Sequence, residues 1–214
     1  MHVVITGASR GVGAALKAAY EAEGHKVTGT SRAGGDGLVA LDVGDAGSIR
    51  AMADALGDAP VDLLVCNAGV YLDKGHALDD GYPAEMWAEQ LAVNVTGPFL
   101  CVQALLPNLR AAGGKVAIIS SQMGSSTLAT GNALIYRASK AAALNLGMNL
   151  AAALKEDGVA VGIYHPGWVQ TDMGGASAAI TPEESAGGLI ERFAVLTPET
   201  TGCFETWNGR AHAI

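Results

Sequence analysis

Short runs of apolar residues alternate with segments of helical periodicity along the whole 214-residue chain. Three of the first four apolar runs are hydrophobic at nearly every position, which is typical of strands that helices cover on both faces. The runs predict strands at Val3–Thr6, Lys26–Thr30, Leu38–Asp42, Leu63–Asn67, Lys115–Ser120, Val159–Tyr164 and Gly202–Trp207.

The intervening segments predict helices at Gly13–Glu23, Ser48–Leu56, Pro83–Leu109, Tyr136–Glu156 and Pro182–Phe193. At the start of the last one, Thr181 and Glu184 have the spacing of a capping box. The β-α-β alternation predicts an α/β fold with a doubly wound parallel sheet of about seven strands and helices on both faces. No linker, repeat or low-complexity tract divides the chain, so we expect one domain over residues 1–214.

Composition narrows the class of protein. Half of the residues are hydrophobic, 16% are charged and 29 are glycine, which is a globular composition. A net charge of -8 disfavours nucleic acid or an anionic membrane as a partner. We expect no signal peptide, since Met1–Ile5 leads straight into a strand. The odd number of separated cysteines, Cys66, Cys101 and Cys203, indicates a reduced cytoplasm, and the scattered histidines predict no metal site.

A glycine-rich turn follows the first strand, in the order Thr6-Gly7-Ala8-Ser9-Arg10-Gly11-Val12-Gly13. Glycines at such a turn let the backbone approach a pyrophosphate, whose charge is met by the N-terminus of the next helix. Three residues, rather than one, separate the first two glycines. The alternative is a tight connection with a purely structural role.

The end of the second strand favours NADP(H) over NAD(H). In dinucleotide-binding folds an acidic residue at this place binds the ribose 2′-hydroxyl. Here Ser31 and Arg32 stand there instead, and Arg10 projects from the glycine turn nearby. Two guanidinium groups and a hydroxyl suit a 2′-phosphate. The alternative is that Arg32 is a solvated loop residue.

Tyr136 and Lys140 are four residues apart in the fourth predicted helix, so they share one face. An adjacent cation favours phenolate, and we therefore expect Lys140 to lower the pKa of Tyr136 below its usual ~10. Taken alone, the pair could equally be an exposed helical contact.

A series of ordered motifs resembles the short-chain dehydrogenase/reductase family along nearly the whole chain. Thr6–Gly13 is similar to T-G-x-x-x-G-x-G, and Asp42-Val43 to the pair that holds the adenine. Later matches are Cys66-Asn67-Ala68-Gly69 (N-N-A-G, with Cys first), Asn94-Val95-Thr96-Gly97, Ser120-Ser121, Tyr136–Lys140 (Y-x-[AS]-[ST]-K) and Pro166–Thr171 (P-G-x-V-x-T). The run His165–Gly175 resembles the small carbonyl-reductase-like members, which include sniffer and C-factor proteins.

The resemblance implies a Rossmann-like fold and a catalytic set. Tyr136 would be the general acid in carbonyl reduction and the base in alcohol oxidation. Lys140 would tune the phenol and bind the nicotinamide ribose. Ser121 would donate to the substrate oxygen, with Ser120 as the runner-up and a strand-end cap as the structural alternative. Asn94 would anchor a relay water, or would only pack beneath the sheet.

The same resemblance implies the cofactor contacts. Val169 and Thr171 would hold the carboxamide of the nicotinamide. The full expected set is Gly7, Ser9, Arg10, Gly11, Val12, Gly13, Ser31, Arg32, Asp42, Val43, Asn67, Ala68, Gly69, Tyr136, Lys140, Pro166, Gly167, Val169 and Thr171. A homodimer or homotetramer would form through the helices near Pro83–Leu109 and Tyr136–Glu156.

The substrate pocket is expected to be small and mostly apolar, because the segment between Thr171 and Thr181 is short and rich in Gly and Ala. The candidates that line it are Ser121, Met123, Leu128, Tyr71 and Trp168. The sequence thus predicts an NADP(H)-dependent oxidoreductase that reduces a small apolar ketone or aldehyde. The alternative is a non-catalytic dinucleotide-sensing or signalling protein, although relatives of that kind often lack the tyrosine or lysine that this chain has.

Overall fold

The computed structural model describes residues 1–214, with every side chain except that of Asp80. Its centre is a parallel sheet of seven strands in the order β3-β2-β1-β4-β5-β6-β7. The strands are β1 (His2–Ile5), β2 (Lys26–Ser31), β3 (Val39–Ala40), β4 (Leu63–Cys66), β5 (Lys115–Ile119), β6 (Ala160–His165) and β7 (Phe204–Thr206). The predicted doubly wound parallel sheet is confirmed.

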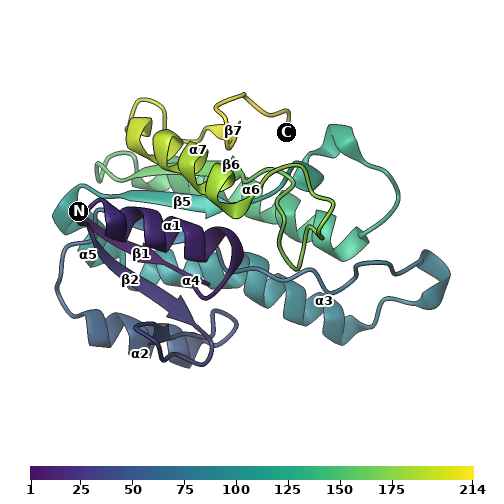
Figure 1. Cartoon of the computed structure of the whole chain (residues 1–214), viewed down its shortest axis with the longest axis horizontal. Helices are drawn as coiled ribbons and strands as arrows, with labels where there is room; N and C mark the ends of the chain where they lie inside the picture. The colour runs from purple at the N-terminus through teal and green to yellow at the C-terminus, as the bar shows by residue number, and fades with distance from the viewer.

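Helices cover both faces of the sheet (Figure 1), and a hydrophobic core lies between the sheet and the helices on each face. On one face α1 (Gly11–Ala22) packs against α7 (Pro182–Val195). On the other lie α2 (Ala46–Leu56), α4 (Gly97–Ala104), α5 (Leu106–Ala112) and α6 (Leu134–Leu154). Strand residues alternate between the cores: Val3 and Ile5 enter the first, while Val4 enters the second.

The third strand is shorter than predicted. Only Val39 and Ala40 pair with β2, whereas the expected strand was Leu38–Asp42. Asp42 leaves the sheet because its carboxylate accepts a hydrogen bond from Gly44 N at 2.9 Å, which closes a turn. The seventh strand is likewise trimmed to Phe204–Thr206 from the expected Gly202–Trp207.

The prediction of one helix over Pro83–Leu109 is wrong. The segment contains α3 (Ala84–Leu91), a π-helical stretch (Ala92–Thr96) and α4, after which α5 turns away by 58°. Pro107 lies in the first turn of α5, and a proline cannot continue a helix because it lacks the N–H and its ring clashes with the preceding turn. The apolar pattern runs through both breaks and therefore hides them.

The capping box at the start of α7 is confirmed: Thr181 Oγ1 accepts from Glu184 N, and Glu184 Oε2 accepts from Thr181 N. Among the described residues, no single helix has the length and apolar character to cross a membrane, and only the bent pair of Ala84–Ala104 and Leu106–Ala112 meets that test of length and composition.

The topology fixes where a ligand can bind. Strand order reverses at β1, which pairs with β2 on one side and with β4 on the other. In open parallel sheets the crevice beyond the carboxyl ends of the strands at such a point is the binding site. The glycine turn follows the carboxyl end of β1 and therefore lies at this crevice. The segments that follow β4, β5 and β6 begin at the same edge of the sheet, because these strands are parallel to β1.

Candidate active site

The turn between β1 and α1 forms a cradle shaped by three glycines. Gly7 and Gly11 have φ angles of 69° and 55°, a region that favours glycine. A Cβ built on Gly13 would overlap Gly7 O. α1 begins at Gly11 without a side-chain cap and without an acidic residue in its first turn. Its N-terminal N–H groups and dipole therefore fit a phosphate group.

Asn67 and Ala68, predicted as cofactor contacts, hold this cradle in shape. Asn67 Nδ2 donates to Thr6 O and to Gly7 O, both at 3.0 Å. In return Thr6 Oγ1 accepts from Asn67 N and Ala68 N, also at 3.0 Å. The end of β4 and the glycine turn are therefore one rigid unit.

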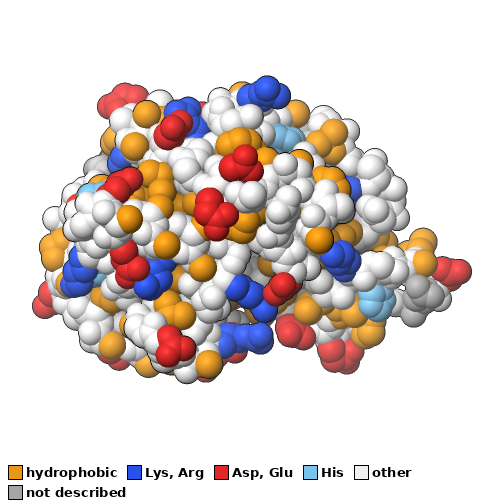
Figure 2. Space-filling view, in the orientation of Figure 1, with side chains coloured by type: hydrophobic (Ala, Val, Ile, Leu, Met, Phe, Trp, Pro, Cys, Tyr) orange, Lys and Arg blue, Asp and Glu red, His pale blue; other side chains and the backbone are white. Residues whose placement is uncertain are grey.

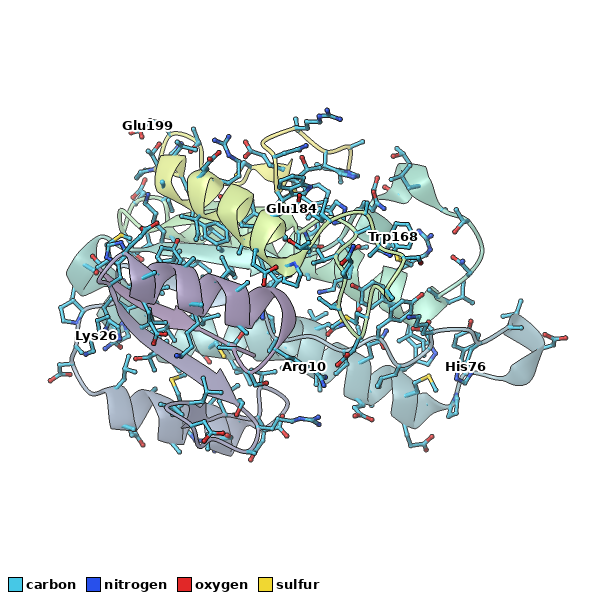
Figure 3. The ribbon with its side chains drawn as sticks, in the orientation of Figure 1. Arg10, Lys26, His76, Trp168, Glu184 and Glu199 are labelled. Carbon is cyan, nitrogen blue, oxygen red and sulfur yellow. The ribbon has the colours of Figure 1, made fainter. Side chains whose placement is uncertain are left out.

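The charged groups of the cradle are exposed. Arg10 forms an ion pair with Asp172 at 3.0 Å, and the two side chains are 75% and 76% exposed. Figure 3 shows Arg10 at the N-terminal end of α1. Arg32 is exposed at the end of β2, and Ser31 Oγ accepts from Gly34 N at 3.1 Å. On this face Figure 2 shows basic and acidic side chains around a hollow.

Asp42 and Val43, predicted to hold the adenine, follow β3. Apart from the turn that Asp42 closes, its backbone N–H donates to Ser48 Oγ at 2.9 Å. Val43 is buried, and its carbonyl lies so close to Gly97 that a Cβ there would overlap it. Both residues are thus fixed by neighbours in α2 and α4.

The segment after β6 closes over the cradle. Pro166 O accepts from Ser185 Oγ at 2.6 Å, and Gly167 has a φ of 92°. Thr171 lies against the glycine turn, with its Cγ2 3.0 Å from a Cβ built on Gly11. Its hydroxyl donates to Val169 O at 3.3 Å, so it is held locally.

Tyr136 and Lys140 lie on one buried face of α6 and are 9% and 5% exposed. Lys140 Nζ is 5.6 Å from the centroid of the Tyr136 ring and donates to Ile119 O, at the end of β5, at 2.9 Å. Tyr71 stacks on the other side, with ring centroids 4.3 Å apart and an interplanar angle of 21°. The phenol is therefore enclosed by α6 and by the loop after β4.

Burial controls the ionisation of this pair. It raises the pKa of Tyr136 to about 12, an effect that a hydrogen bond with the Ser121 side chain partly offsets and that Tyr71 and Asp73 reinforce. It lowers the pKa of Lys140 to about 8. The expected lowering of the Tyr136 pKa is therefore wrong for this structure, because burial disfavours the charged phenolate. The phenol is neutral and holds a proton that it can donate.

The two serines that follow β5 have different tasks. Ser120 Oγ donates to Lys140 O at 2.8 Å and is buried, so it is committed to the helix. Ser121 is extended, its hydroxyl accepts from Met123 N at 3.1 Å, and its side chain acts on the Tyr136 phenol by lowering its pKa. The arrangement favours Ser121 over Ser120 as the group beside a reacting oxygen.

Asn94 lies in the π-helical stretch, a feature that is frequent at functional sites. Its Oδ1 accepts from Val70 N at 2.9 Å, and its Nδ2 donates to Val70 O at 2.9 Å and to Ser139 Oγ at 3.0 Å. A Cβ on Gly69 would lie 3.2 Å from Asn94 Oδ1 and 3.5 Å from Lys140 Nζ. Asn94 thus joins the loop after β4 to α6, immediately beside Lys140.

Asp73 is a functional candidate that the sequence reasoning missed. Its side chain is fully buried, and its carboxylate accepts hydrogen bonds from the backbone N–H groups of Ile135 and Tyr136. An aspartate in a polar loop gives no signal of this kind in a single sequence, since its partners lie more than sixty positions away.

The predicted substrate-pocket residues are only partly brought together. Tyr71 and Ser121 border the Tyr136 phenol. Trp168 and Leu128 are 52% and 44% exposed, and Trp168 Nε1 donates to Gly174 O at 2.9 Å. Met123 lines a cavity of about 390 Å³ on the outer side of α6, together with Ala141, Met148 and Ile214, among others. That cavity is separate from the buried face that carries Tyr136.

Comparison with known proteins matches these features to one family. A family model described as short chain dehydrogenase matches residues 1–180. The chain belongs to the short-chain dehydrogenase family. Its parallel sheet, its glycine turn after β1 and the Tyr136–Lys140 pair on α6 lie in the elements in which the sequence motifs were expected.

Among the relatives of this short-chain dehydrogenase is 1-hydroxy-2-glutathionyl-2-methyl-3-butene dehydrogenase of Rhodococcus sp. (strain AD45), 39% identical over 65% of this chain. The alignment spans 62% of that enzyme, which is less than two thirds of its length. C-signal of Myxococcus xanthus is 40% identical over 62% of this chain and 81% of its own.

Solved structures of similar fold include NADPH-bound carbonyl reductase from chicken fatty liver, with a TM-score of 0.89 and 29% identity over 100% of this chain and 98% of that one. A short-chain dehydrogenase/reductase from Burkholderia multivorans with bound NADP has a TM-score of 0.88 and 27% identity, over 100% of this chain and 99% of that one.

Proposed function

We propose that the protein is an NADP(H)-dependent carbonyl reductase that acts on small, mostly apolar ketones or aldehydes. The observation that carries this proposal is the buried, neutral phenol of Tyr136, which borders Ser121 and Tyr71 beside a phosphate-shaped cradle. With a pKa of about 12 the Tyr136 phenol stays protonated throughout the physiological range, so it holds the proton that carbonyl reduction needs.

The residues present fit a phosphorylated dinucleotide. The uncapped N-terminus of α1 offers N–H groups to a pyrophosphate, and Gly7 and Gly11, with positive φ angles, carry no side chain that would cover this end of the helix. Arg10 and Arg32 are exposed at the same edge, available to a 2′-phosphate. When bound, reduced NADP would supply the hydride. Similar proteins that hold NADP or NADPH support this choice.

The chain's own residues handle the proton. As the carbonyl carbon gains hydride, negative charge develops on the oxygen, where Ser121 donates a hydrogen bond and Tyr136 gives up its proton. The bond from the phenol oxygen to hydrogen breaks and a bond from hydrogen to the substrate oxygen forms, which leaves an alcohol. Lys140 stabilises the transient phenolate, since its ammonium lies 5.6 Å from the ring centroid.

Asn94 holds the loop after β4 against α6, and so keeps Lys140 and Tyr71 in place. The ring of Tyr71, stacked on Tyr136, gives the site an apolar wall beside the phenol. A wall of this kind suits an uncharged substrate. We further propose a homodimer or homotetramer in which α4 and α6 pair between subunits.

The deciding experiment follows cofactor oxidation over a panel of aryl and alkyl aldehydes and ketones, with NADPH and NADH side by side. We expect turnover of several small apolar members, faster with NADPH. No turnover of any member would contradict the proposed reaction. Faster turnover with NADH would contradict the role given to Arg10 and Arg32.

A second candidate is a dinucleotide-binding signalling protein without turnover, favoured by the likeness to C-signal. The two functions separate in Tyr136→Phe. An enzyme loses turnover while it still binds NADPH, whereas a sensor keeps its biological output.

A further inference from the structure

Helix α6, which carries Tyr136, begins without a cap of its own. The residue before it, Ala133, has a left-handed φ of 51° and offers no side-chain hydrogen bond. The first N–H groups of a helix have no partner within the helix and need one from outside. A buried helix start therefore depends on a group from another part of the chain.

Asp73, in the loop after β4, is that group. Its Oδ2 accepts from Ile135 N at 2.8 Å, and its Oδ1 and Oδ2 accept from Tyr136 N at 3.2 and 3.4 Å. The side chain has no exposed surface. A buried carboxylate is stable only when its oxygens are hydrogen-bonded, so this contact is a built feature of the site.

Gln90, in the last turn of α3, also holds the carboxylate of Asp73 by a hydrogen bond. Its Nε2 donates to Asp73 Oδ1 at 3.3 Å, and its Oε1 accepts from Leu72 N at 2.6 Å. Gln90 is also fully buried. Tyr71 lies in the same loop, immediately before Leu72 and Asp73, and stacks on the ring of Tyr136. The loop therefore contacts Tyr136 twice, at its backbone N–H through Asp73 and at its ring through Tyr71.

We propose that Asp73 is a positioning residue, whose carboxylate fixes the first turn of α6 and thereby places the Tyr136 phenol against Tyr71 and Ser121. This inference rests on the proposed function, in which Tyr136 donates the proton. Asp73 acts through Tyr136 and does not contact the substrate.

The charge of Asp73 also acts on the phenol. The groups that face Tyr136 are Lys140 on α6, Ser121 after β5, and Tyr71 and Asp73 from the loop after β4. Of these, Asp73 raises the pKa of Tyr136 because a nearby negative charge disfavours phenolate. Removing that charge therefore lowers the pH at which the phenol titrates.

The test compares Asp73→Asn with Asp45→Asn, a matched change at the carboxylate that caps α2 by accepting from Gly47 N at 2.8 Å. For Asp73→Asn we expect kcat for carbonyl reduction to fall about tenfold, with an unchanged KM for NADPH, because only the position of the proton donor is disturbed. The Asp45→Asn variant keeps the wild-type kcat at saturating cofactor.

Two further readouts need no turnover. With tyrosine labelled at the ring carbon that bears the hydroxyl, NMR titration follows Tyr136, identified by its loss in Tyr136→Phe, and we expect its pKa to drop in Asp73→Asn. Amide hydrogen exchange at Ile135 and Tyr136 should quicken about tenfold. If the wild type reduces no carbonyl while both shifts occur, the proposed function fails and the anchoring stands.

An unchanged phenol titration together with unchanged exchange at Ile135 and Tyr136 would overturn the inference. If Asp73→Asn does not fold, Gln90→Met tests the same anchor with the charge retained. We expect it to lower kcat and to quicken exchange at Tyr136. A merely structural role would reduce thermal stability in either variant and leave kcat per folded molecule unchanged, which also overturns the inference.

Discussion

The two halves of the site are built in opposite ways. In the half around Tyr136, the catalytic candidates are buried and bonded to the protein: Lys140 to Ile119, Asn94 to Val70 and Ser139. In the nucleotide half, Arg10 and Asp172 are about three-quarters exposed and meet only each other. The side chains proposed for catalysis are thus held in place before any ligand binds, whereas the charged side chains proposed to bind the nucleotide remain exposed to water. Chemistry needs fixed geometry, whereas a charged ligand needs groups that it can reach, and the exposed Arg10–Asp172 pair is weak enough for Arg10 to exchange its partner.

The largest effect is expected at the centre of the buried half. Tyr136→Phe removes the proton donor and should lower kcat by about 10²–10⁴-fold, with NADPH affinity retained. Steady-state kinetics and fluorescence titration with NADPH measure both quantities. Tyr20→Phe is the control, since Tyr20 is buried on α1 and packs in the core of the other face. A Tyr136→Phe variant that keeps its kcat would show that the phenol is not the donor.

The second prediction concerns the cost of burying Lys140. Its pKa is about 8 in the folded protein and about 10.5 when unfolded, so the unfolded chain binds more protons between those values. Stability should therefore rise with pH between about 8 and 10.5, by up to about 3 kcal/mol, and this gain should be absent below about pH 8, where Lys140 is protonated in both states.

Urea unfolding of the wild type and of Lys140→Met at pH 7.5, 9 and 10 measures this, since the variant lacks the rise. At these pH values Tyr136 keeps its proton in the folded state. Lys26→Met, at an exposed position, should reproduce the wild-type slope. Equal slopes in all three proteins would contradict the desolvation of Lys140.

The third prediction concerns the glycine turn, which we expect one added methyl group at Gly13 to disturb. In Gly13→Ala the new methyl overlaps Gly7 O and lies 2.5 Å from Asn67 Nδ2, so we expect a loss of about 1–3 kcal/mol in unfolding free energy and a large loss of NADPH affinity. Gly187→Ala is the matched control, because its helical position has open space around it. That variant should gain up to about 1 kcal/mol from helix propensity. Equal melting temperatures for the wild type and Gly13→Ala would refute the close approach of Gly13 to Gly7 O.

The exposed half should respond mainly in affinity. Arg32→Ala removes one charge available to a 2′-phosphate and should weaken NADPH binding about tenfold, with little effect on NADH and on kcat. Isothermal titration with both cofactors tests the difference. Arg210→Ala, an exposed arginine beyond β7, should change neither affinity. A parallel loss for NADPH and NADH would mean that Arg32 does not read the phosphate.

The smallest effect is expected at the ion pair itself. Exposed pairs contribute about 0–1 kcal/mol, so Asp172→Asn should barely change stability. It releases Arg10, however, and should tighten NADPH binding about two- to threefold at low salt, with the gain lost at high ionic strength. Weaker binding in Asp172→Asn would show that the carboxylate assists the nucleotide instead of competing with it.

The contrast between the halves also explains what the sequence could predict. The strands, the glycine turn and the Tyr136–Lys140 pair follow from local patterns, because periodicity and spacing are properties of neighbouring residues. The break before α5 was missed since the apolar pattern continues through it. The role of Asp73 was missed for a different reason, as its capping of α6 exists only after two distant segments fold together. The direction of the Tyr136 pKa shift likewise depends on burial, which the sequence shows only indirectly.

Gly69 has a consequence for how this scaffold can evolve. One added methyl there would stand 3.2 Å from Asn94 Oδ1, which is closer than most real contacts, and 3.5 Å from Lys140 Nζ. A single codon change at this position therefore requires Asn94, which ties the loop after β4 to α6, to move by a few tenths of an ångström. Glycine is thus the residue that this junction accommodates without rearrangement.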